Sequence, residues 1–227
     1  MATTLNDLLA SFSGTTPLLP LPDFVLFPQT VQPFQIFEPR YLELMKDSLA
    51  GERMVTIPLL KEDASGQAAT PAFHSIATMG YIKDAQSAES DKLNILVTGL
   101  VKVRVEEVDS DKPYRRGAVT PIADFDQVSD AEHRRQSILH RFQSMMDTIE
   151  AAGDLEALAD PDIPLQMLCH VIASALPIPA QEKQKMLELQ SLELRIDILL
   201  NFMESGLLSM GALGPLELLL PTHPWWN

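Results

Sequence analysis

One short stretch of this chain combines aromatic rings, prolines and the start of a helix, and it constrains the fold more than any other. Residues 23–45 read DFVLFPQTVQPFQIFEPRYLELM, with four phenylalanines and three prolines. Each proline removes a backbone donor, so a strand in the middle of a sheet does not tolerate this spacing. The stretch predicts short strands at 23–27 and 34–36, the second at a sheet edge or a strand start because Pro33 precedes it. We expect the rings to fill a small β-rich core.

A helix is predicted directly after these strands. Pro39 suits the first helical position, with Glu38 at or near the cap. Apolar residues then recur at helical spacing as far as Leu49. Gly51 is well placed to end the helix in the left-handed conformation.

The rest of the first half has the pattern of strands separated by polar linkers. Valine alternates with charged residues over 101–106, which is the period of two of a strand. The run LNILVTGLVKVRVEEV at 93–108 predicts a pair of strands with a bend or bulge at Gly99, and Gly80 is a second bulge candidate. Further strands are predicted at 54–60, 74–82 and 114–122. Short strands with bulges and prolines favour a closed or partly closed barrel.

The second half has helical periodicity instead. The tetrapeptide SDAE at 129–132 is a capping box and predicts the start of a helix. Three more helices are predicted to start near Pro164, Pro179 and Ser191, and the short loops between them favour side-by-side packing. We expect four parts: an N-terminal extension at 1–16, a β-barrel with one helix at 17–127, a helical bundle at 128–206 and an apolar tail at 207–227.

Composition disfavours several classes of protein. Seventeen basic residues face 31 acidic ones, giving a formal charge of −14 with no basic block, so a nucleic-acid partner is not expected. No basic residue precedes Arg40 and no apolar run reaches the roughly 20 residues that cross a bilayer, so neither a signal peptide nor a membrane span is expected. The single cysteine, Cys169, cannot form an internal disulfide and favours a reducing compartment. We expect a cytoplasmic protein.

Residue types that commonly carry catalysis do not form a recognisable site. Cys169 and His170 are adjacent on a predicted helix, so their side chains diverge by about 100° and cannot meet. We expect a buried thiol beside a boundary histidine. His133 and His140 lie about 10.5 Å apart on one helix face, too far apart to share a zinc ion directly. We expect no catalytic residue, no metal and no cofactor.

The order of these segments resembles a known family. LLPLPDFVLFPQTVQPFQIFEPRYLELMKDSL is similar to the start of the Lon protease N-terminal domain, the LON substrate-binding domain, and FEPRY within it especially resembles standalone bacterial LON-domain proteins. MGYI and LVTGLVKVRV are similar to the later strands of that family. EKQKMLELQSLELRIDILL resembles its helical part, including Lys183, Gln184 and Arg195. The resemblance covers roughly residues 17–205.

The resemblance implies both a fold and a function. The fold is α+β, a PUA-like six-stranded pseudo-β-barrel followed by a C-terminal helical bundle. The function is a non-catalytic module that binds unfolded or extended protein segments, with delivery of clients to a separate protease as an extension. In full-length Lon the chemistry lies in an ATPase module and a Ser–Lys peptidase domain, and no G-x-x-x-x-G-K-[ST] occurs in this chain, so we expect no enzymatic activity.

Two other functions remain open from the residues. A small-molecule sensor or hydrolase would use a pocket in the barrel, an alternative that rests on fold analogy alone. RNA binding, known for some PUA-like domains, is disfavoured by the acidic charge.

The barrel half offers four candidate residues for contacting a partner. Phe73 ends the polar loop 61–73, and Tyr114 stands next to the basic doublet Arg115 and Arg116. Two interpretations of the doublet stay open: strand residues that offset the acidic surface, or a grip for an acidic or phosphorylated partner.

The C-terminal tail supplies the remaining candidates, Trp225 and Trp226. Chain ends are usually polar, whereas this one is apolar and carries both tryptophans. The tail is expected either to fold back on its own domain or to dock into a second copy or a client groove, which would make the protein a homo-oligomer.

Overall fold

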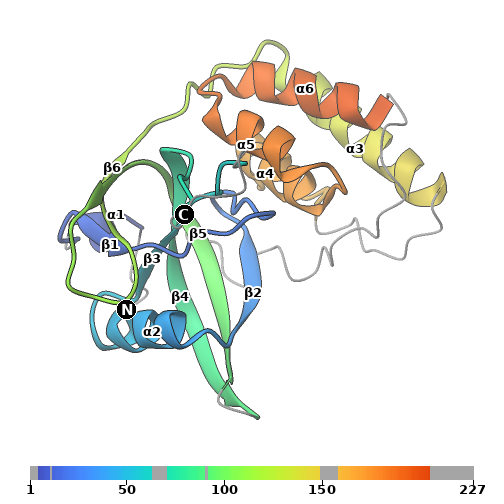
Figure 1. The fold of residues 1–227 in the computed structure, drawn as a ribbon. Coiled ribbons are helices and arrows are strands. Elements are labelled where there is room, and N and C mark those ends of the chain that lie inside the picture. The colour runs from blue at the N-terminus through green and yellow to red at the C-terminus, as the bar shows by residue number, and fades with distance from the viewer. Residues whose placement is uncertain (1–4, 11, 63–70, 90–91, 149–157, 205–227) are drawn as a thin grey trace. The chain divides into compact units, whose positions relative to one another are not determined.

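The structure is a computed structural model that describes residues 5–10, 12–62, 71–89, 92–148 and 158–204. The chain forms two compact units, with the boundary between Ile122 and Ala123. The first contains all the strands and is called the β-barrel unit. The second is called the helical unit (Figure 1). No helix in the described ranges is long and apolar enough to span a bilayer.

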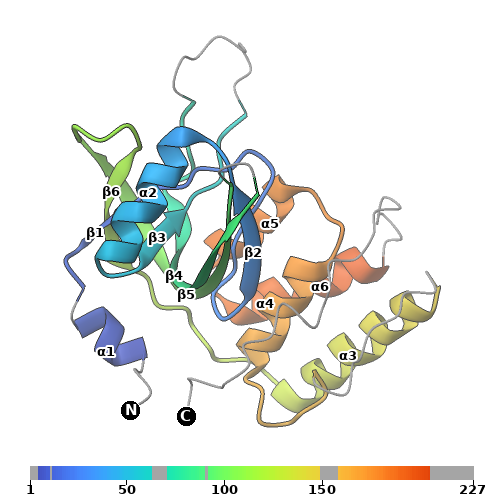
Figure 2. The ribbon, with the colours of Figure 1, turned by 90° about the horizontal axis from the view of Figure 1, so that it is seen from below.

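The β-barrel unit is built on one antiparallel sheet. Its strands run in the order β1-β6-β5-β4-β3, and β2 pairs with the N-terminal half of β5. Two helices accompany them, and α2 lies beside β3 at one end of the sheet (Figure 2). The elements are α1 (Leu5–Ala10), β1 (Thr15–Pro17), β2 (Val31–Ile36), α2 (Pro39–Ala50), β3 (Met54–Ile57), β4 (Ile76–Ala88), β5 (Lys92–Val108) and β6 (Arg116–Pro121).

The segment after β1 closes the sheet into a barrel. β1 pairs with β6, and the chain then forms parallel bridges from Leu18 to Thr56 and from Leu21 to Leu59. The amide of Leu19 donates to the carbonyl of Thr56 at 2.9 Å, which joins the β1 edge to the β3 edge. Both edges are thereby paired, which removes the exposed backbone of an open sheet. The expected six-stranded pseudo-β-barrel with a helical bundle is confirmed.

The run 93–108 forms one strand, where the sequence predicted a pair. β5 continues through Gly99 for 17 residues and pairs with β2, β4 and β6 along its length. Its register with β4 shifts where Gly80 pairs with Gly99. A bulge is therefore present at the two glycines that the sequence indicated as bulge candidates. A Cβ at Gly99 would overlap the carbonyl oxygen of Phe27, so a glycine lets that loop approach the strand closely.

The apolar run at 23–27 is buried but is not a strand, which corrects the prediction. Val25, Leu26 and Phe27 are all almost fully buried in irregular backbone. The hydroxyl of Thr78 donates to the carbonyl of Leu26 at 2.6 Å and that of Thr30 to the carbonyl of Phe27 at 2.8 Å. Side chains therefore satisfy these backbone groups in place of a partner strand.

The rings of this region are divided between core and surface. Phe27 is fully buried, whereas Phe24 and Phe34 are half-buried and pack edge to face with their ring centres 5.1 Å apart. Phe37 is 63% exposed. The expectation that all these rings fill the core is therefore wrong for Phe37.

Helix α2 begins as the sequence predicted and ends differently. Pro39 is its first residue and Glu38 its N-cap. Gly51 is the C-cap but has φ −106°, so it is not left-handed. The left-handed residue is Arg53, with φ 59°, whose amide donates to the carbonyl of Ser48. The left-handed residue that was predicted at Gly51 is therefore found two residues later, at Arg53.

The helical unit packs four helices against one another. Helix α6 contacts both α3 and α4, and α3 also contacts α4. The predicted capping box is not formed, because α3 starts two residues after Ser129 and the carboxylate of Glu132 accepts from Gln136 instead. The elements are α3 (Ala131–Thr148), α4 (Leu165–Ala175), α5 (Ala180–Glu188) and α6 (Leu192–Glu204).

A buried ion pair organises this unit. Arg195 is fully buried and its guanidinium lies 2.8 Å from Oδ2 of Asp124. It also donates to the carbonyls of Met186 and Leu189 at the end of α5 and lies 3.1 Å from Nε2 of His170. His170 is therefore fully buried, not at the boundary as predicted. The cluster fixes α4, α5 and α6 around one charge.

Candidate partner-binding groove

The loop between β5 and β6 forms one wall of an open groove in the β-barrel unit. This loop, residues 109–115, faces the start of α2 and the two ends of the 61–73 loop. The cavity has a volume of about 460 Å³. We call it the client groove, and it is lined by Pro20, Arg40, Tyr41, Leu60, Pro71, Glu107, Val108, Asp109, Ser110, Lys112, Pro113, Tyr114 and Arg115.

The ends of the 61–73 loop are fixed by the barrel. Leu60 and Phe73 form an antiparallel bridge, and the amide of Lys61 donates to the carbonyl of Ala72 at 2.8 Å. Leu60 and Pro71 therefore hold defined positions on the groove wall.

Arg115 is the main organiser of this wall. Its guanidinium makes a two-pronged ion pair with Glu107, both N–O distances being 2.6 Å, and donates to the carbonyl of Pro71 at 2.8 Å. Its plane also lies 4.4 Å from the ring centre of Phe73. The hydrogen bond from Arg115 holds the pKa of Glu107 below its usual value. Arg115 thus joins the C-terminal end of the 61–73 loop to Glu107 on β5.

Tyr114 connects the same loop to α2. Its ring is buried and its hydroxyl donates to Oδ2 of Asp47 at 2.6 Å. Lys112 lies 2.8 Å from the same oxygen. Burial and the bond to Asp47 both raise the pKa of Tyr114, and the hydrogen bonds from Lys112 and Tyr114 lower the pKa of Asp47. Tyr114 therefore presents only part of its surface to the groove.

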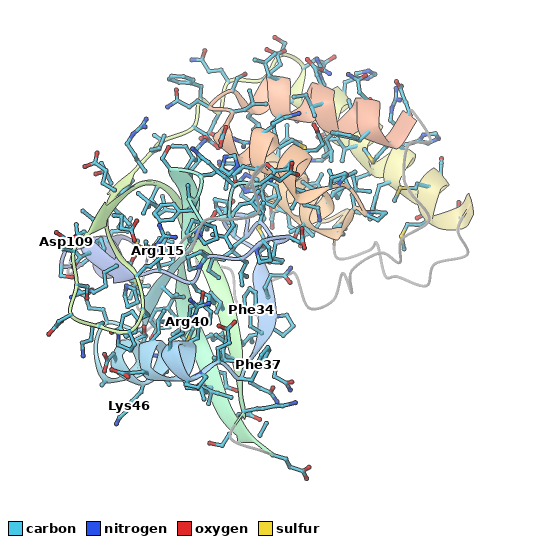
Figure 3. The ribbon with its side chains drawn as sticks, in the orientation of Figure 1. Phe34, Phe37, Arg40, Lys46, Asp109 and Arg115 are labelled. Atoms are coloured by element: carbon cyan, nitrogen blue, oxygen red, sulfur yellow. The ribbon has the colours of Figure 1, made fainter. Side chains whose placement is uncertain are left out.

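The opposite rim comes from the first turn of α2. Arg40 pairs with Glu38 at 2.8 Å and lies over the ring of Tyr41, 4.5 Å from its centre. Burial raises the pKa of Tyr41, so the hydroxyl stays protonated at neutral pH. Arg40, Arg115 and Asp109 are labelled in Figure 3, with Lys46 further along α2.

These contacts decide what the groove offers a ligand. Its three basic side chains are each paired with a carboxylate of the same unit. The rest of the lining is mixed: three proline rings, Leu60 and Val108 are apolar, whereas Ser110 and the carboxylate of Asp109 are polar, and Arg40 covers one face of the Tyr41 ring. Such a lining suits an extended segment that offers both apolar side chains and backbone hydrogen bonds.

The candidate contact residues of the sequence divide into three groups. Tyr114 and Arg115 line the groove and Phe73 stacks on Arg115, so the structure brings these three together. Arg116 lies on β6 and does not line the groove. Trp225 and Trp226, with the tail that carries them, lie outside the described residues.

Sequence reasoning missed the other wall of the groove. Tyr41 and Arg40 sit in the FEPRY stretch that predicted the helix start, and Pro113 precedes Tyr114 in the loop. The available signals were Tyr41 in the first turn of the predicted helix and Pro113 in the loop before Tyr114. Nothing local in the sequence shows that the first turn of this helix and the 109–115 loop face each other in the closed barrel.

The cysteine and the histidines that were candidates for catalysis belong to the helical unit, whereas the groove is lined by residues of the β-barrel unit. Cys169 is fully buried in α4, and burial raises the pKa of its thiol to about 12, so it is not a nucleophile at neutral pH. His133 and His140 are exposed on α3. Within the described ranges, no three His, Cys, Asp or Glu side chains are grouped as metal ligands.

The decisive comparison is with protein families. The sequence signature of the ATP-dependent protease La (LON) substrate-binding domain matches residues 15–205. The chain belongs to the LON substrate-binding domain family. The match spans both units of this LON domain, and the family resemblance drawn from the sequence is confirmed.

Curated relatives of this LON domain are bacterial Lon proteases. One from Chloroherpeton thalassium is 28% identical over 200 residues, which is 85% of this chain and 23% of that protease. One from Anaeromyxobacter dehalogenans is 23% identical over 194 residues, or 82% of this chain and 22% of the protease. The chain therefore spans under a quarter of the length of these relatives and matches their substrate-binding part.

Solved structures show the same fold. The N-terminal domain of a Mycobacterium avium complex Lon protease superposes with a TM-score of 0.66 at 14% identity, covering 85% of this chain and all of that domain. A Lon N-terminal domain protein from Xanthomonas campestris has a TM-score of 0.59 at 22% identity, covering 83% of this chain and 98% of that one.

Proposed function

We propose that this LON domain recognises protein substrates and holds extended, apolar segments of unfolded proteins in the client groove. The observation that carries the proposal is the pairing of the groove's cations: Arg40 with Glu38, Lys112 with Asp47 and Arg115 with Glu107. Because these cations are paired within the unit, charge matching contributes little, and a bound segment is stabilised by contact with the proline rings and Leu60 and by hydrogen bonds to polar groups of the lining such as Ser110. Binding of this kind depends weakly on client sequence.

Family membership supports the same function. The family is described as a substrate-binding domain, and the relatives that it matches are Lon proteases. The net charge of −14 disfavours polyanions such as nucleic acids as clients.

Charge insertion from the two groove walls tests the proposal. Leu60→Asp and Pro113→Asp each place a carboxylate in the apolar lining, where burying an unpaired charge opposes binding. We expect each variant to weaken binding of fluorescently labelled β-casein, an unfolded model client, by about tenfold or more, measured by anisotropy. Thermal unfolding of both variants verifies that the barrel is intact.

Phe37→Ser is the comparison variant. Phe37 is an exposed ring of the β-barrel unit and does not line the groove. Its removal is expected to leave β-casein affinity within about twofold, as for surface substitutions away from a binding site. Loss of binding in Phe37→Ser with full binding in both groove variants would reject the groove as the client site.

Delivery of clients to a protease is the extension of this proposal. The curated relatives are Lon proteases. We therefore infer that a segment held in the groove is passed to an ATP-dependent protease. The sequence predicted that this protease is a separate polypeptide. Adding the wild-type protein should change the rate at which a purified Lon protease from the same cell degrades β-casein. Adding the Leu60→Asp variant should leave that rate unchanged. Self-association through the tail remains a prediction, tested by sedimentation of the chain with and without residues 221–227.

A further inference from the structure

The C-terminal tail combines an apolar sequence with almost no charge. Residues 205–227 follow α6 and lie outside the described residues. They include the run LELLL at 216–220 and both tryptophans of the chain, Trp225 and Trp226. Their only ionised side chain at neutral pH is that of Glu217, and they contain no lysine or arginine. Indole rings gain much from burial, so this composition favours docking against an apolar surface.

The client groove has the chemistry that such a segment requires. Its three basic side chains are each paired with a carboxylate of the same unit, so an uncharged occupant leaves no cation without a partner. Three proline rings, Leu60 and Val108 supply apolar wall, and Ser110 is among the polar groups of the lining. The tail itself carries prolines at 215, 221 and 224, each of which fixes φ near −65° and favours the extended backbone that an open groove accepts.

Other apolar surfaces in the described parts of the chain are less suited to two indole rings. The large apolar side chains that are exposed there are Phe37, Phe125 and Leu194. Phe125 and Leu194 both lie near the start of α6, where the amide of Leu192 donates to the carbonyl of Phe125. Single exposed side chains are ordinary on a protein surface, whereas a groove contacts an aromatic ring from two sides.

The tail is long enough to reach the groove of its own chain. Trp225 follows Glu204, the last residue of α6, by 21 residues. At about 3.3 Å per extended residue, it can lie up to about 70 Å from that helix. A compact unit of about 100 residues has a radius of gyration of about 13 Å, so this reach exceeds the diameter of either unit.

We propose that the tail occupies the client groove of its own chain and competes there with clients. The inference rests on the proposed function, because it assigns a regulator to the same groove. A tethered segment has an effective concentration on the order of millimolar, which favours its own groove over that of a second copy at micromolar protein. A client must displace the tail to bind, so weakly bound segments are excluded.

Tryptophan fluorescence of the full chain tests where the tail docks, since Trp225 and Trp226 are its only tryptophans. We expect the wild-type protein to shield them from acrylamide, a neutral quencher. Leu60→Asp and Pro113→Asp should each increase quenching toward the value in urea, because a carboxylate in either wall opposes burial of an apolar segment. Phe37→Ser and Leu194→Ser are the controls outside the groove and should leave quenching unchanged.

The double variant Trp225→Ser with Trp226→Ser, also in the full chain, tests the competition. We expect it to bind fluorescently labelled β-casein about threefold to tenfold more tightly than wild type, because the tethered competitor is weakened. A synthetic peptide of residues 215–227 added to this variant should weaken β-casein binding again. The same peptide carrying Trp225→Ser and Trp226→Ser should not. Phe37→Ser, which removes an exposed ring elsewhere, is the matched control and should not tighten binding.

Four results would overturn the inference. The first is acrylamide quenching that Leu60→Asp and Pro113→Asp leave unchanged. The second is quenching that increases in Leu194→Ser instead, which would place the tail on the helical unit. The third is shielding that depends on protein concentration, which would place it in a second copy. The fourth is a double variant that binds β-casein no more tightly than wild type.

Failure of the proposed function gives a different result. In that case β-casein binds neither to wild type nor to the double variant, while Leu60→Asp still exposes the tryptophans. If the function holds and the inference fails, both proteins bind β-casein equally and the groove variants leave the tryptophans unaffected. The two measurements therefore separate the regulator from the site that it regulates.

Discussion

The hydroxyl of Tyr114 donates to the carboxylate of Asp47 at 2.6 Å, across 67 residues of sequence. This bond fixes the β5–β6 loop to the last turns of α2, and Lys112 binds the same carboxylate from the same loop. Tyr114 and Lys112 also lie in the wall of the client groove. The relationship therefore sets the shape of that groove.

Removing the Tyr114 hydroxyl should destabilise the barrel modestly. Tyr114→Phe keeps the buried ring and loses one hydrogen bond to a charged acceptor, so we expect the free energy of unfolding to fall by about 1–2 kcal/mol in urea titrations. Tyr81→Phe is the control: it removes a hydroxyl that has no hydrogen bond in the described chain and keeps the ring beside Arg53. Equal effects of the two substitutions would show that the Tyr114–Asp47 bond contributes nothing specific.

The Glu107–Arg115 ion pair predicts how the free energy of unfolding changes as the pH falls. The folded state lowers the pKa of Glu107, so its contribution is complete above the unfolded value of about 4.3 and is lost as the pH falls through the lower folded value. The difference in unfolding free energy between wild type and Glu107→Gln should therefore shrink between about pH 5 and pH 3.

The neighbouring residue provides the control for this titration. Glu106 is exposed on β5 and has no ion pair in the described chain. Glu106→Gln should show no such pH-dependent difference. A wild-type to Glu107→Gln difference that is constant across this pH range would refute the assignment of the lowered pKa to the ion pair.

The sequence predicted several features that depend on local chemistry, although not the cap of α3 or the residue that ends α2. Pro39 with Glu38 before it predicted the start of α2, and Ser191 predicted the start of α6, where its hydroxyl accepts from the amide of Leu194. Proline and cap residues act within one turn, so they are readable without tertiary information. Phe73, Tyr114 and Arg115 were predicted to contact a partner. The structure brings them together around one groove, with Tyr114 mostly buried, and their role in binding stays a prediction.

Features that depend on distant contacts were predicted wrongly. The 23–27 run has the composition of a strand, but Thr78 and Thr30 satisfy its carbonyls from elsewhere in the barrel. His170 carries a polar ring that suits a boundary, yet Arg195 from another helix provides it with a buried partner. The run 93–108 was predicted as two strands with a bend or bulge at Gly99. The bulge is present, but the strand is continuous, and Gly99 lets the Phe27 loop approach it closely.

Gly99→Ala tests the close approach between the Phe27 loop and β5. Because the new Cβ would overlap a backbone oxygen, the loop or strand must move, and we expect a loss of about 3 kcal/mol or more in unfolding free energy. Gly51→Ala is the matched substitution, since its Cβ would lie 3.4 Å from the nearest atom and its φ is negative. It should change stability by less than about 1 kcal/mol. A Gly99→Ala protein as stable as Gly51→Ala would contradict the packing described.

Arg195 should be the most sensitive charged position of the helical unit. Arg195→Met leaves the buried carboxylate of Asp124 without its cation and removes the donors to the carbonyls of Met186 and Leu189. We therefore expect the unfolding free energy of this unit to fall by about 3–5 kcal/mol. Adding Asp124→Leu should recover part of that loss. Arg134→Met breaks a partly exposed pair with Asp197 and should cost about 1 kcal/mol or less. Similar losses for Arg134→Met and Arg195→Met would contradict this assignment.

Photo-crosslinking to a client tests the central claim most directly. A benzoylphenylalanine placed at Asp109, on the edge of the client groove, is compared with one placed at Lys46, an exposed position on α2 outside it (Figure 3). The measured quantity is the yield of covalent adduct with β-casein, and excess unlabelled unfolded protein serves as competitor. The account predicts a competed adduct from position 109 and little from position 46. An equal or higher yield from position 46 would contradict it.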